Sequence, residues 1–373
     1  MKIAQFAKFA NNATNQILGV TGLQLENLQS MFSYPNAINV TDPKLVSGDI
    51  IFIDDGAPIN AKRVRVYIQT FQSGSGDPSP SNIRAISGWD NIIINHRKRN
   101  LFNKHSITEN SWIRANTTII EPQQNYFVSD YIPVKKGNVI TCTKRGASRC
   151  IYYDVYKNPI SYFSWNDGTL NPLYDGFVRV TDLNINLDTL QIEVGLTKTD
   201  YENFEGHNYS IDFSPEIGTV YGGVLDVVEG VLIINKKAVN LGTLTYTRQK
   251  ITDEIYIFSG DIANLGAKPL SENGCCSIYT LITGNRVSGG NNRIGINTYG
   301  TRLFVRDDRY TDANTFKQAI NDQILVYELN EPIVYNIDPI DILMFDGINT
   351  IIANCGSMEL EYYRQESGVK PYV

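Results

Sequence analysis

The sequence predicts a mainly β protein, made of antiparallel β-sandwich and jelly-roll modules with a short α-helical N-terminal segment. The chain has 373 residues, which exceeds one small domain and indicates two or three. Its 42% hydrophobic and 11% aromatic content excludes a disordered chain. Short β-prone runs recur between Gly, Pro and Asn or Asp turn signals, which is typical of sandwiches and jelly rolls.

Charge and motif content narrow the functions that the chain can have. The 33 Lys and Arg against 39 Asp and Glu give a net charge of -6, which argues against a general nucleic-acid binder. Three histidines are too few for most imidazole metal sites, and the common hydrolase, zinc-protease, P-loop and dinucleotide motifs are absent. We therefore expect no catalytic residue, no metal and no cofactor, although two facing carboxylates could still cleave a glycan.

The cysteines and the first residues bear on where the protein is made. Five cysteines with no C-x-x-C pair suggest no disulfide framework and a reducing cytoplasm. Gln5, Lys8 and Asn11 interrupt the apolar run that a signal peptide needs. No stretch approaches the roughly 18 apolar residues of a membrane-spanning helix. We expect a chain made in the cytoplasm, without membrane insertion.

Residues 1–48 show helical periodicity. Apolar residues recur at spacings of three and four, which predicts one or two short amphipathic helices. The periodicity leaves two readings open: a helix packed on its own domain, or a segment for self-association or docking. The candidate oligomerisation residues are Ile3, Phe6, Ala10, Ala13 and Ile17.

A β domain is expected from about residue 49. Val64, Val66 and Ile68 alternate with polar residues, as in a half-buried strand. The stretch SGSGDPSPSN (73–82) predicts an ordered turn or an exposed loop. The basic run HRKR (96–99) fits a phosphate contact less well than a solvated loop, because the chain as a whole is acidic.

Residues 101–205 combine short strand-like runs with many aromatic residues. Aromatic rings can stack on the apolar faces of sugars, and neighbouring Arg, Asn and Asp can satisfy their hydroxyls. The segments 149–153 and 161–167 contain both kinds of group. The alternative is that Trp165 and half of the tyrosines fill a sandwich core. The candidate glycan-binding residues are Arg149, Tyr153, Tyr162, Trp165, Asn166 and Asp167.

The last part of the chain also reads as strands. Residues 221–235 predict two strands joined by a turn at Glu229 and Gly230. A strand-rich region follows to about Tyr327, with one short helix at 312–320. No repeat of fixed period is present, which disfavours solenoids and propellers.

Four blocks of sequence resemble modular tail and baseplate-associated structural proteins encoded by phages and prophages of Gram-positive bacteria. The first is GSGDPSPSNIRAISGWD (74–90), followed by NLF (100–102). The second comprises SDYIPVKKGN (129–138), IYYDVYKNPIS (151–161) and LQIEVGLTKTDYENF (190–204), and is similar to jelly rolls of carbohydrate-binding-module type. The third and fourth are VYGGVLDVVEGVLIINKKAVNLGTLTY (220–246) and the closing segment 326–364.

This resemblance implies a domain organisation but no catalytic residue. Residues 49–100, 206–235 and 326–366 would form one discontinuous β-sandwich. Residues 101–205 would be a carbohydrate-binding-module-like jelly roll, and 236–325 a second β-rich insert. The segment 1–48 lies outside the resemblance and would attach or oligomerise the chain.

The resemblance also implies a function. The leading hypothesis is a non-enzymatic virion protein, a tail or baseplate appendage that contacts host cell-surface polysaccharide through its jelly roll. Its partners would be further copies of itself, as a homotrimer, and other virion proteins. Two alternatives stay open: a purely structural adaptor or decoration protein, and a depolymerase of surface polysaccharide.

Overall fold

The structure, a computed structural model, is mainly β, as the sequence predicts. Most sheets are antiparallel, and α3 (Ala313–Ala319) is the one α-helix among the described residues. The predicted oligomerisation residues Ile3, Phe6, Ala10, Ala13 and Ile17 lie outside them. The structure describes residues 43–53, 58–143, 149–165, 168–252, 255–269, 274–283, 286–345 and 347–364.

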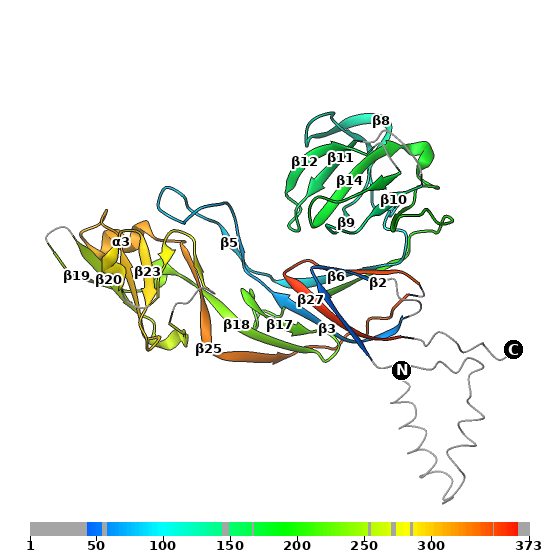
Figure 1. Ribbon diagram of the computed structural model, residues 1–373. Coiled ribbons are helices and arrows are strands. Elements are labelled where there is room, and N and C mark those ends of the chain that lie inside the picture. The colour runs from blue at the N-terminus through cyan, green and yellow to red at the C-terminus, as the bar shows by residue number, and fades with distance from the viewer. Residues whose placement is uncertain are drawn as a thin grey trace, which may run out of the picture.

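The centre of the molecule is a sandwich of two sheets, which we call the central sandwich (Figure 1). Its seven-stranded sheet runs in the order β1 (Lys44–Gly48), β27 (Ser357–Arg364), β3 (Pro58–Ile68), β17 (Gly222–Asp226), β18 (Val231–Asn240), β25 (Ile324–Asn336) and β21 (Cys275–Cys276). Its four-stranded sheet runs β16 (Gly206–Asp212), β6 (Asn91–Arg97), β26 (Asn349–Ala353) and β2 (Ile50–Ile53). The apolar inner faces of both sheets belong to one core cluster.

One predicted boundary is wrong. The sequence places Lys44–Gly48 in the N-terminal helical segment, but these residues form β1 and pair along their whole length with β27. The alternation of exposed and half-buried residues in KLVSG suits an edge strand, and the pairing partner comes from more than 300 residues later in the chain. Helical periodicity upstream could not reveal that partner.

Strand β6 shows how alternation builds the central sandwich. Ile92, Ile94 and His96 point into the core, and each is fully buried. Asn95 and Arg97 lie on the opposite, outer face, as the two-residue period of a strand requires. The outer face of β6 therefore carries Asn95 and Arg97 beside Ile93, while its inner face is apolar apart from one histidine.

His96 is accommodated in the core by Asn349. The Asn349 side-chain amide donates to the carbonyls of Phe345 (3.0 Å) and Gly347 (2.9 Å), so its oxygen is the acceptor for the Phe345 amide and for His96 Nε2, at 2.8 and 2.7 Å. His96 therefore carries its proton on Nε2. Burial lowers the pKa of His96 to about 4, which keeps the ring neutral.

Residues 101–205, which we call the first insert, form a second sandwich. The larger sheet comprises β12 (Pro159–Ser164), β11 (Arg149–Tyr153), β14 (Gly176–Leu183), β8 (Ile120–Val128) and β7 (Thr108–Ile113), with β9 (Ile132–Val134) also paired to β14. The smaller sheet comprises β13 (Thr169–Leu170), β10 (Ile140–Cys142) and β15 (Ile192–Val194), and a 3-10 turn, η1 (Asn184–Asn186), precedes β15. The first insert has a core of its own.

Residues 236–325, which we call the second insert, share the core of the central sandwich. The sheet comprises β19 (Tyr246–Lys250), β20 (Tyr256–Asp261), β24 (Arg302–Arg306), β23 (Arg293–Ile296) and β22 (Thr280–Leu281), where β22 and β23 are parallel. Short 3-10 turns are η2 (Leu241–Thr243), η3 (Ala263–Leu265) and η4 (Arg286–Gly289). Strands β18 and β25 run from the central sandwich into this insert as one ribbon (Figure 1).

Two local predictions are confirmed. The turn between β17 and β18 contains Gly230, whose φ of 70° lies in the left-handed region that glycine tolerates. The predicted helix at 312–320 is α3, where the Asp312 side chain accepts hydrogen bonds from the amides of Asn314 and Thr315.

The loop 73–84 is an ordered structure wound around one buried arginine. Arg84 donates to the carbonyls of Ser73, Gly74 and Gly76, and its own amide donates to Ser277 of the second insert at 2.7 Å. A two-stranded ribbon, β4 (Phe71–Gln72) with β5 (Ile86–Ser87), holds the base of the loop. The loop therefore ties the central sandwich to the second insert.

Candidate functional site

The predicted glycan-binding residues do not form one site. Trp165 is only 9% exposed and packs in the core of the first insert. Tyr153 is 5% exposed, and burial raises the pKa of its phenol. These two predictions are wrong, because both rings fill space between packed layers and offer no face to a ligand. Asn166 and Asp167 lie outside the described residues.

Arg149 and Tyr162 are already engaged by neighbouring groups. The Arg149 guanidinium lies 4.0 Å from the centre of the Trp112 ring and donates to the carbonyl of Ile113 at 3.2 Å. Trp112 in turn donates to Glu121 at 2.9 Å, and this hydrogen bond is the main cause that lowers the pKa of Glu121. The half-buried Tyr162 hydroxyl lies 3.2 Å from that of Ser164.

Aromatic and polar groups converge instead where the first insert meets the central sandwich. The outer face of the four-stranded sheet is divided in two. One half is covered: Ile50 and Ile352 pack against Tyr153 and Phe177 of the first insert in a small buried cluster. The other half, around Asn95 of β6, is open.

The open half is the floor of a cleft of about 480 Å³, which we call the junction cleft. This volume lies within the range of about 300–1,000 Å³ that is usual for small-molecule sites. The residues that line it are Phe71, Ser87, Gly88, Trp89, Ile93, Asn95, Arg97, Asp130, Tyr131, Val155, Tyr156, Lys157, Asn158, Phe177, Ile352, Ala353 and Asn354. They come from both the central sandwich and the first insert, so neither part forms the cleft alone.

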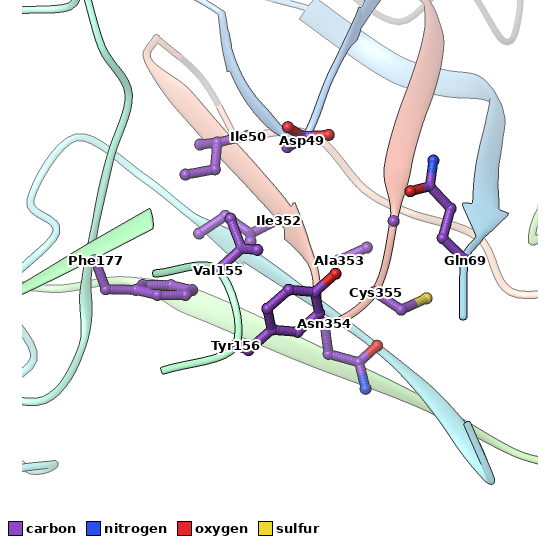
Figure 2. A pocket seen from close by; sticks show the side chains of 11 residues that line it. Asp49, Ile50, Gln69, Val155, Tyr156, Phe177, Ile352, Ala353, Asn354 and Cys355 are labelled. Carbon is purple, nitrogen blue, oxygen red and sulfur yellow. The ribbon is translucent and has the colours of Figure 1, made fainter. Parts of the chain in front are cut away.

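A smaller cavity of about 110 Å³ adjoins the junction cleft. Figure 2 shows its lining, with Val155 and Tyr156 of the first insert reaching toward Ile352 and Asn354. Both cavities share Val155 and Tyr156 in their walls. Tyr156 also lies against Phe71 of the central sandwich, with ring centres 4.0 Å apart. Tyr156 therefore lines both cavities and also contacts the central sandwich.

A turn at 154–158 holds Tyr156 in this place. The Asp154 carboxylate accepts hydrogen bonds from the amides of Tyr156 (2.9 Å) and Asn158 (2.8 Å) and from the Asn158 side chain at 3.0 Å. Lys157 adopts a left-handed backbone with a φ of 65°. Such a conformation is unfavourable for lysine, and it persists here because Asp154 fixes the residues on both sides.

Arg97 supplies a largely buried charge beside the cleft, and the more exposed Asp130 faces it. Arg97 donates to the carbonyls of Leu101 and Tyr131, both at 3.2 Å, and lies 3.9 Å from Asp130. Burial lowers the pKa of Arg97, and Asp130 opposes this effect. Asp130 also accepts a hydrogen bond from the Ser106 hydroxyl at 3.3 Å. Arg97 therefore positions the start of the first insert against the floor of the cleft.

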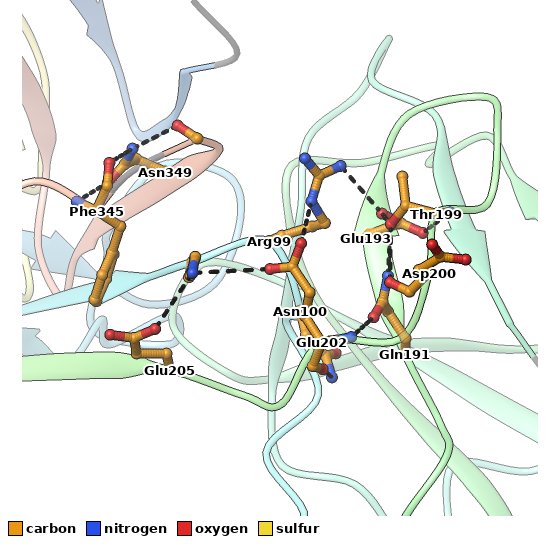
Figure 3. Close-up of polar contacts among 12 residues, drawn as sticks. Arg99, Asn100, Gln191, Glu193, Thr199, Asp200, Glu202, Glu205, Phe345 and Asn349 are labelled. Atoms are coloured by element: carbon orange, nitrogen blue, oxygen red, sulfur yellow. Dashed lines mark hydrogen bonds and ion pairs between the residues drawn. The ribbon is translucent and has the colours of Figure 1, made fainter. Parts of the chain in front are cut away.

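The rest of the basic run 96–99 fixes the two chain crossings between the modules. Lys98 pairs with Glu205 at 3.5 Å. Figure 3 shows Arg99 between Glu193 and Glu202, at 3.6 and 3.1 Å. These ion pairs explain the basic run as a structural feature and leave no free cation there for a phosphate.

The block at 190–204 has a structural role at the same crossing. Glu193 is 1% exposed, and its carboxylate accepts the Thr199 amide (2.9 Å) and hydroxyl (2.7 Å). The Gln191 side chain accepts the Glu202 amide at 2.6 Å, and Asn100 donates to the Glu202 carbonyl at 2.9 Å. Both crossings between the central sandwich and the first insert are therefore fixed by buried polar groups.

Other kinds of site are not found in the part of the chain that the structure describes. No group of three or more His, Cys, Asp or Glu side chains could hold a metal ion there. No helix within the described ranges is long and apolar enough to cross a membrane. The five cysteines, which all lie in these ranges, form no disulfide with one another.

The sequence contained a partial signal for the cleft. Trp89 and Tyr156 both lie inside blocks that carry the resemblance, beside turn residues that place side chains at the end of a strand. Asn95 had no such signal, and its proximity to Tyr131 of the block 129–138 could not be predicted, because it depends on how two modules dock. Comparisons of the chain with protein-family models, with curated proteins and with solved structures found no match.

Proposed function

We propose that this chain is a non-enzymatic structural protein of a phage or prophage tail or baseplate, and that its junction cleft binds carbohydrate on the host cell surface. The observation that carries the binding role is the set of rings from Phe71, Trp89, Tyr131 and Tyr156 around the cleft. Rings of this kind stack on the apolar faces of sugars, while amides and hydroxyls beside them bond to sugar hydroxyls.

The acidic groups of the cleft support binding more than cleavage. Asp130 is the one carboxylate that lines the junction cleft, and it lies beside Arg97. Asp49 lines the adjoining cavity. Glycosidases commonly need two carboxyl groups facing each other across the scissile bond, one of which must accept or donate a proton. No second carboxylate faces Asp130 among the described residues that line the junction cleft.

The virion role is supported by the order of the four sequence blocks. A receptor-binding appendage of this kind would work as a homotrimer formed through the segment that precedes β1, alongside other tail or baseplate proteins. Weak single sites then gain affinity through multivalency. Assembly in the host cytoplasm would suit the reduced cysteines.

Binding of purified full-length protein to Gram-positive cell walls tests this proposal, with Tyr156→Ala and Tyr201→Ala as a matched pair. The two tyrosines are 38% and 39% exposed, and Tyr201 lies in the first insert outside the cleft lining. Loss of a stacking ring should weaken wall binding about tenfold in Tyr156→Ala, equivalent to about 1.4 kcal/mol. Tyr201→Ala should bind as the unsubstituted protein does.

Two other outcomes would replace the proposal. If the unsubstituted protein fails to bind walls, the chain is better described as a structural adaptor or decoration protein. If it releases reducing sugar from wall polysaccharide over hours, it is a depolymerase.

A further inference from the structure

The charged groups of the junction cleft are already matched within the protein. Arg97 has two carbonyl acceptors and a carboxylate, and its side chain is 12% exposed. Asp130 faces that guanidinium and accepts the Ser106 hydroxyl. A ligand with a phosphate or carboxylate would have to displace these contacts to reach Arg97.

The Lys157 side chain likewise contacts other groups of the protein. Its ammonium lies 4.7 Å from the centre of the Tyr131 ring and 5.8 Å from that of Phe177. These distances fit cation–π contacts, which hold the charge over ring faces. The chain as a whole carries a net charge of -6, which repels a polyanion approaching the cleft.

Neutral polar groups remain for a ligand to contact. The half-buried Asn95 side chain makes no hydrogen bond to any described residue, although it lies on the cleft floor next to Ile352 of β26. By contrast, the Asn354 amide oxygen is used by the Ile93 amide at 2.9 Å. An asparagine amide offers two donors and an acceptor, which suits a group such as a hydroxyl that both donates and accepts.

We infer that the junction cleft takes an uncharged, polyhydroxylated chain, a neutral polysaccharide, and that Asn95 is the specificity-determining residue that reads its hydroxyls. This inference rests on the proposed function and adds the class of glycan. The rings of Trp89 and Tyr156 would hold the apolar faces of successive sugars, and Asn95 would bond to the hydroxyls turned toward the sheet.

The strand register supplies a matched control for Asn95. Asn208 of β16 lies directly opposite Asn95 of β6, so both side chains are on the same outer face of the sheet. Asn208 is exposed and does not line the cleft. Asn95→Ala and Asn208→Ala therefore remove the same group from neighbouring positions, one inside the cleft and one outside.

The experiment measures binding of the full chain to neutral and anionic fractions of Gram-positive wall polysaccharide, separated by anion exchange. The neutral fraction should bind, with an affinity that changes less than about twofold between about 50 and about 500 mM NaCl. Asn95→Ala should weaken binding about tenfold, while Asn208→Ala stays within about twofold. Thermal melts should show both variants folded as the unsubstituted protein is.

The failures of the two proposals can be told apart. Preference for the anionic fraction, with affinity falling steeply as salt rises, would overturn the inference while the cleft still binds glycan in a Tyr156-dependent way. Equal binding of the neutral fraction by Asn95→Ala and the unsubstituted protein would also overturn it. Absence of binding to either fraction would overturn both the inference and the proposed function.

Discussion

The two inserts join the central sandwich in different ways. The second insert shares one continuous hydrophobic core with the sandwich, and the β18–β25 ribbon runs through both. The first insert keeps a core of its own and meets the sandwich through a small cluster around Ile50 and Ile352. A fused junction leaves no room for a ligand, whereas a docked junction leaves a cleft lined by both parts. The binding site is therefore expected at the docked junction.

The largest expected effect comes from paired core truncations that test whether one junction is fused and the other docked. Phe258 is fully buried and stacks on Phe316 with ring centres 4.0 Å apart. Phe258→Ala should cost roughly 3–5 kcal/mol and lower a transition that includes the central sandwich. Trp165→Ala should cost a similar amount in a separate transition of the first insert. Differential scanning calorimetry checks both, and a sandwich that melts unchanged in Phe258→Ala would contradict the shared core.

The next effect is a pH dependence of stability, which should be confined to the transition of the central sandwich and the second insert. Because the pKa of His96 is about 4 in the folded protein and 6.5 in a free side chain, the unfolded chain binds a proton first as the pH falls. Stability should therefore decrease from about pH 6.5 down to about pH 4 by roughly 3 kcal/mol, and this contribution should level off below that.

Urea unfolding at several pH values, compared with His96→Gln, measures the His96 contribution. The glutamine amide can still donate to Asn349 but does not titrate in this range. The difference in pH slope between the two proteins should appear in the transition of the central sandwich. A difference seen instead in the transition of the first insert would contradict the assignment of His96 to the shared core.

A smaller effect is expected at the loop that ties the second insert to the sandwich. Arg84→Met should cost about 2 kcal/mol, because carbonyls of Ser73, Gly74 and Gly76 lose a buried charged donor. Arg84→Lys should recover part of this loss. Denaturant titration gives the values, and limited proteolysis should cut the loop faster in Arg84→Met. If Arg84→Met and the unsubstituted protein were equally stable and were cleaved at the same rate, the loop would not contribute to holding the second insert on the sandwich.

The smallest expected effect on stability concerns the contact between the first insert and the central sandwich. Tyr156→Ala removes one ring contact with Phe71, and the ring is 38% exposed. The expected cost is at most about 1.5 kcal/mol, in either transition. A much larger loss measured by calorimetry would show that Tyr156 is a structural wedge, and its effect on wall binding could then not be attributed to stacking on sugar.

The sequence blocks that could be recognised are those that build turns and crossings. Asn82 donates to the carbonyls of Ser75 (3.2 Å) and Asp77 (2.9 Å), and Asn349 closes the loop before β26. Such contacts join residues that are close in the sequence, so the spacing of the turn residues is recognisable. The mainly β fold could be predicted from that spacing. Where they cross between modules, as with Glu193 and Arg99, the spacing alone did not show the partner.

The candidate site was less predictable than the fold. Whether a side chain faces solvent or the core depends on strands that are distant in the sequence. Trp165 and Tyr153 lie in aromatic-rich stretches that look suited to sugar, but the layers packed on either side bury both. Asn95 reads as one polar position in an alternating strand. It becomes a cleft residue only because the first insert covers Ile352 and leaves the neighbouring position open.

Hydrogen exchange of the full chain, with and without wall polysaccharide, tests most directly whether the ligand occupies the cleft between two modules. We predict slower exchange in two places at once: the turn 154–158 of the first insert and the segment around Ser87 and Trp89 of the central sandwich. Protection confined to one module, or located on a surface away from the cleft, would contradict the account.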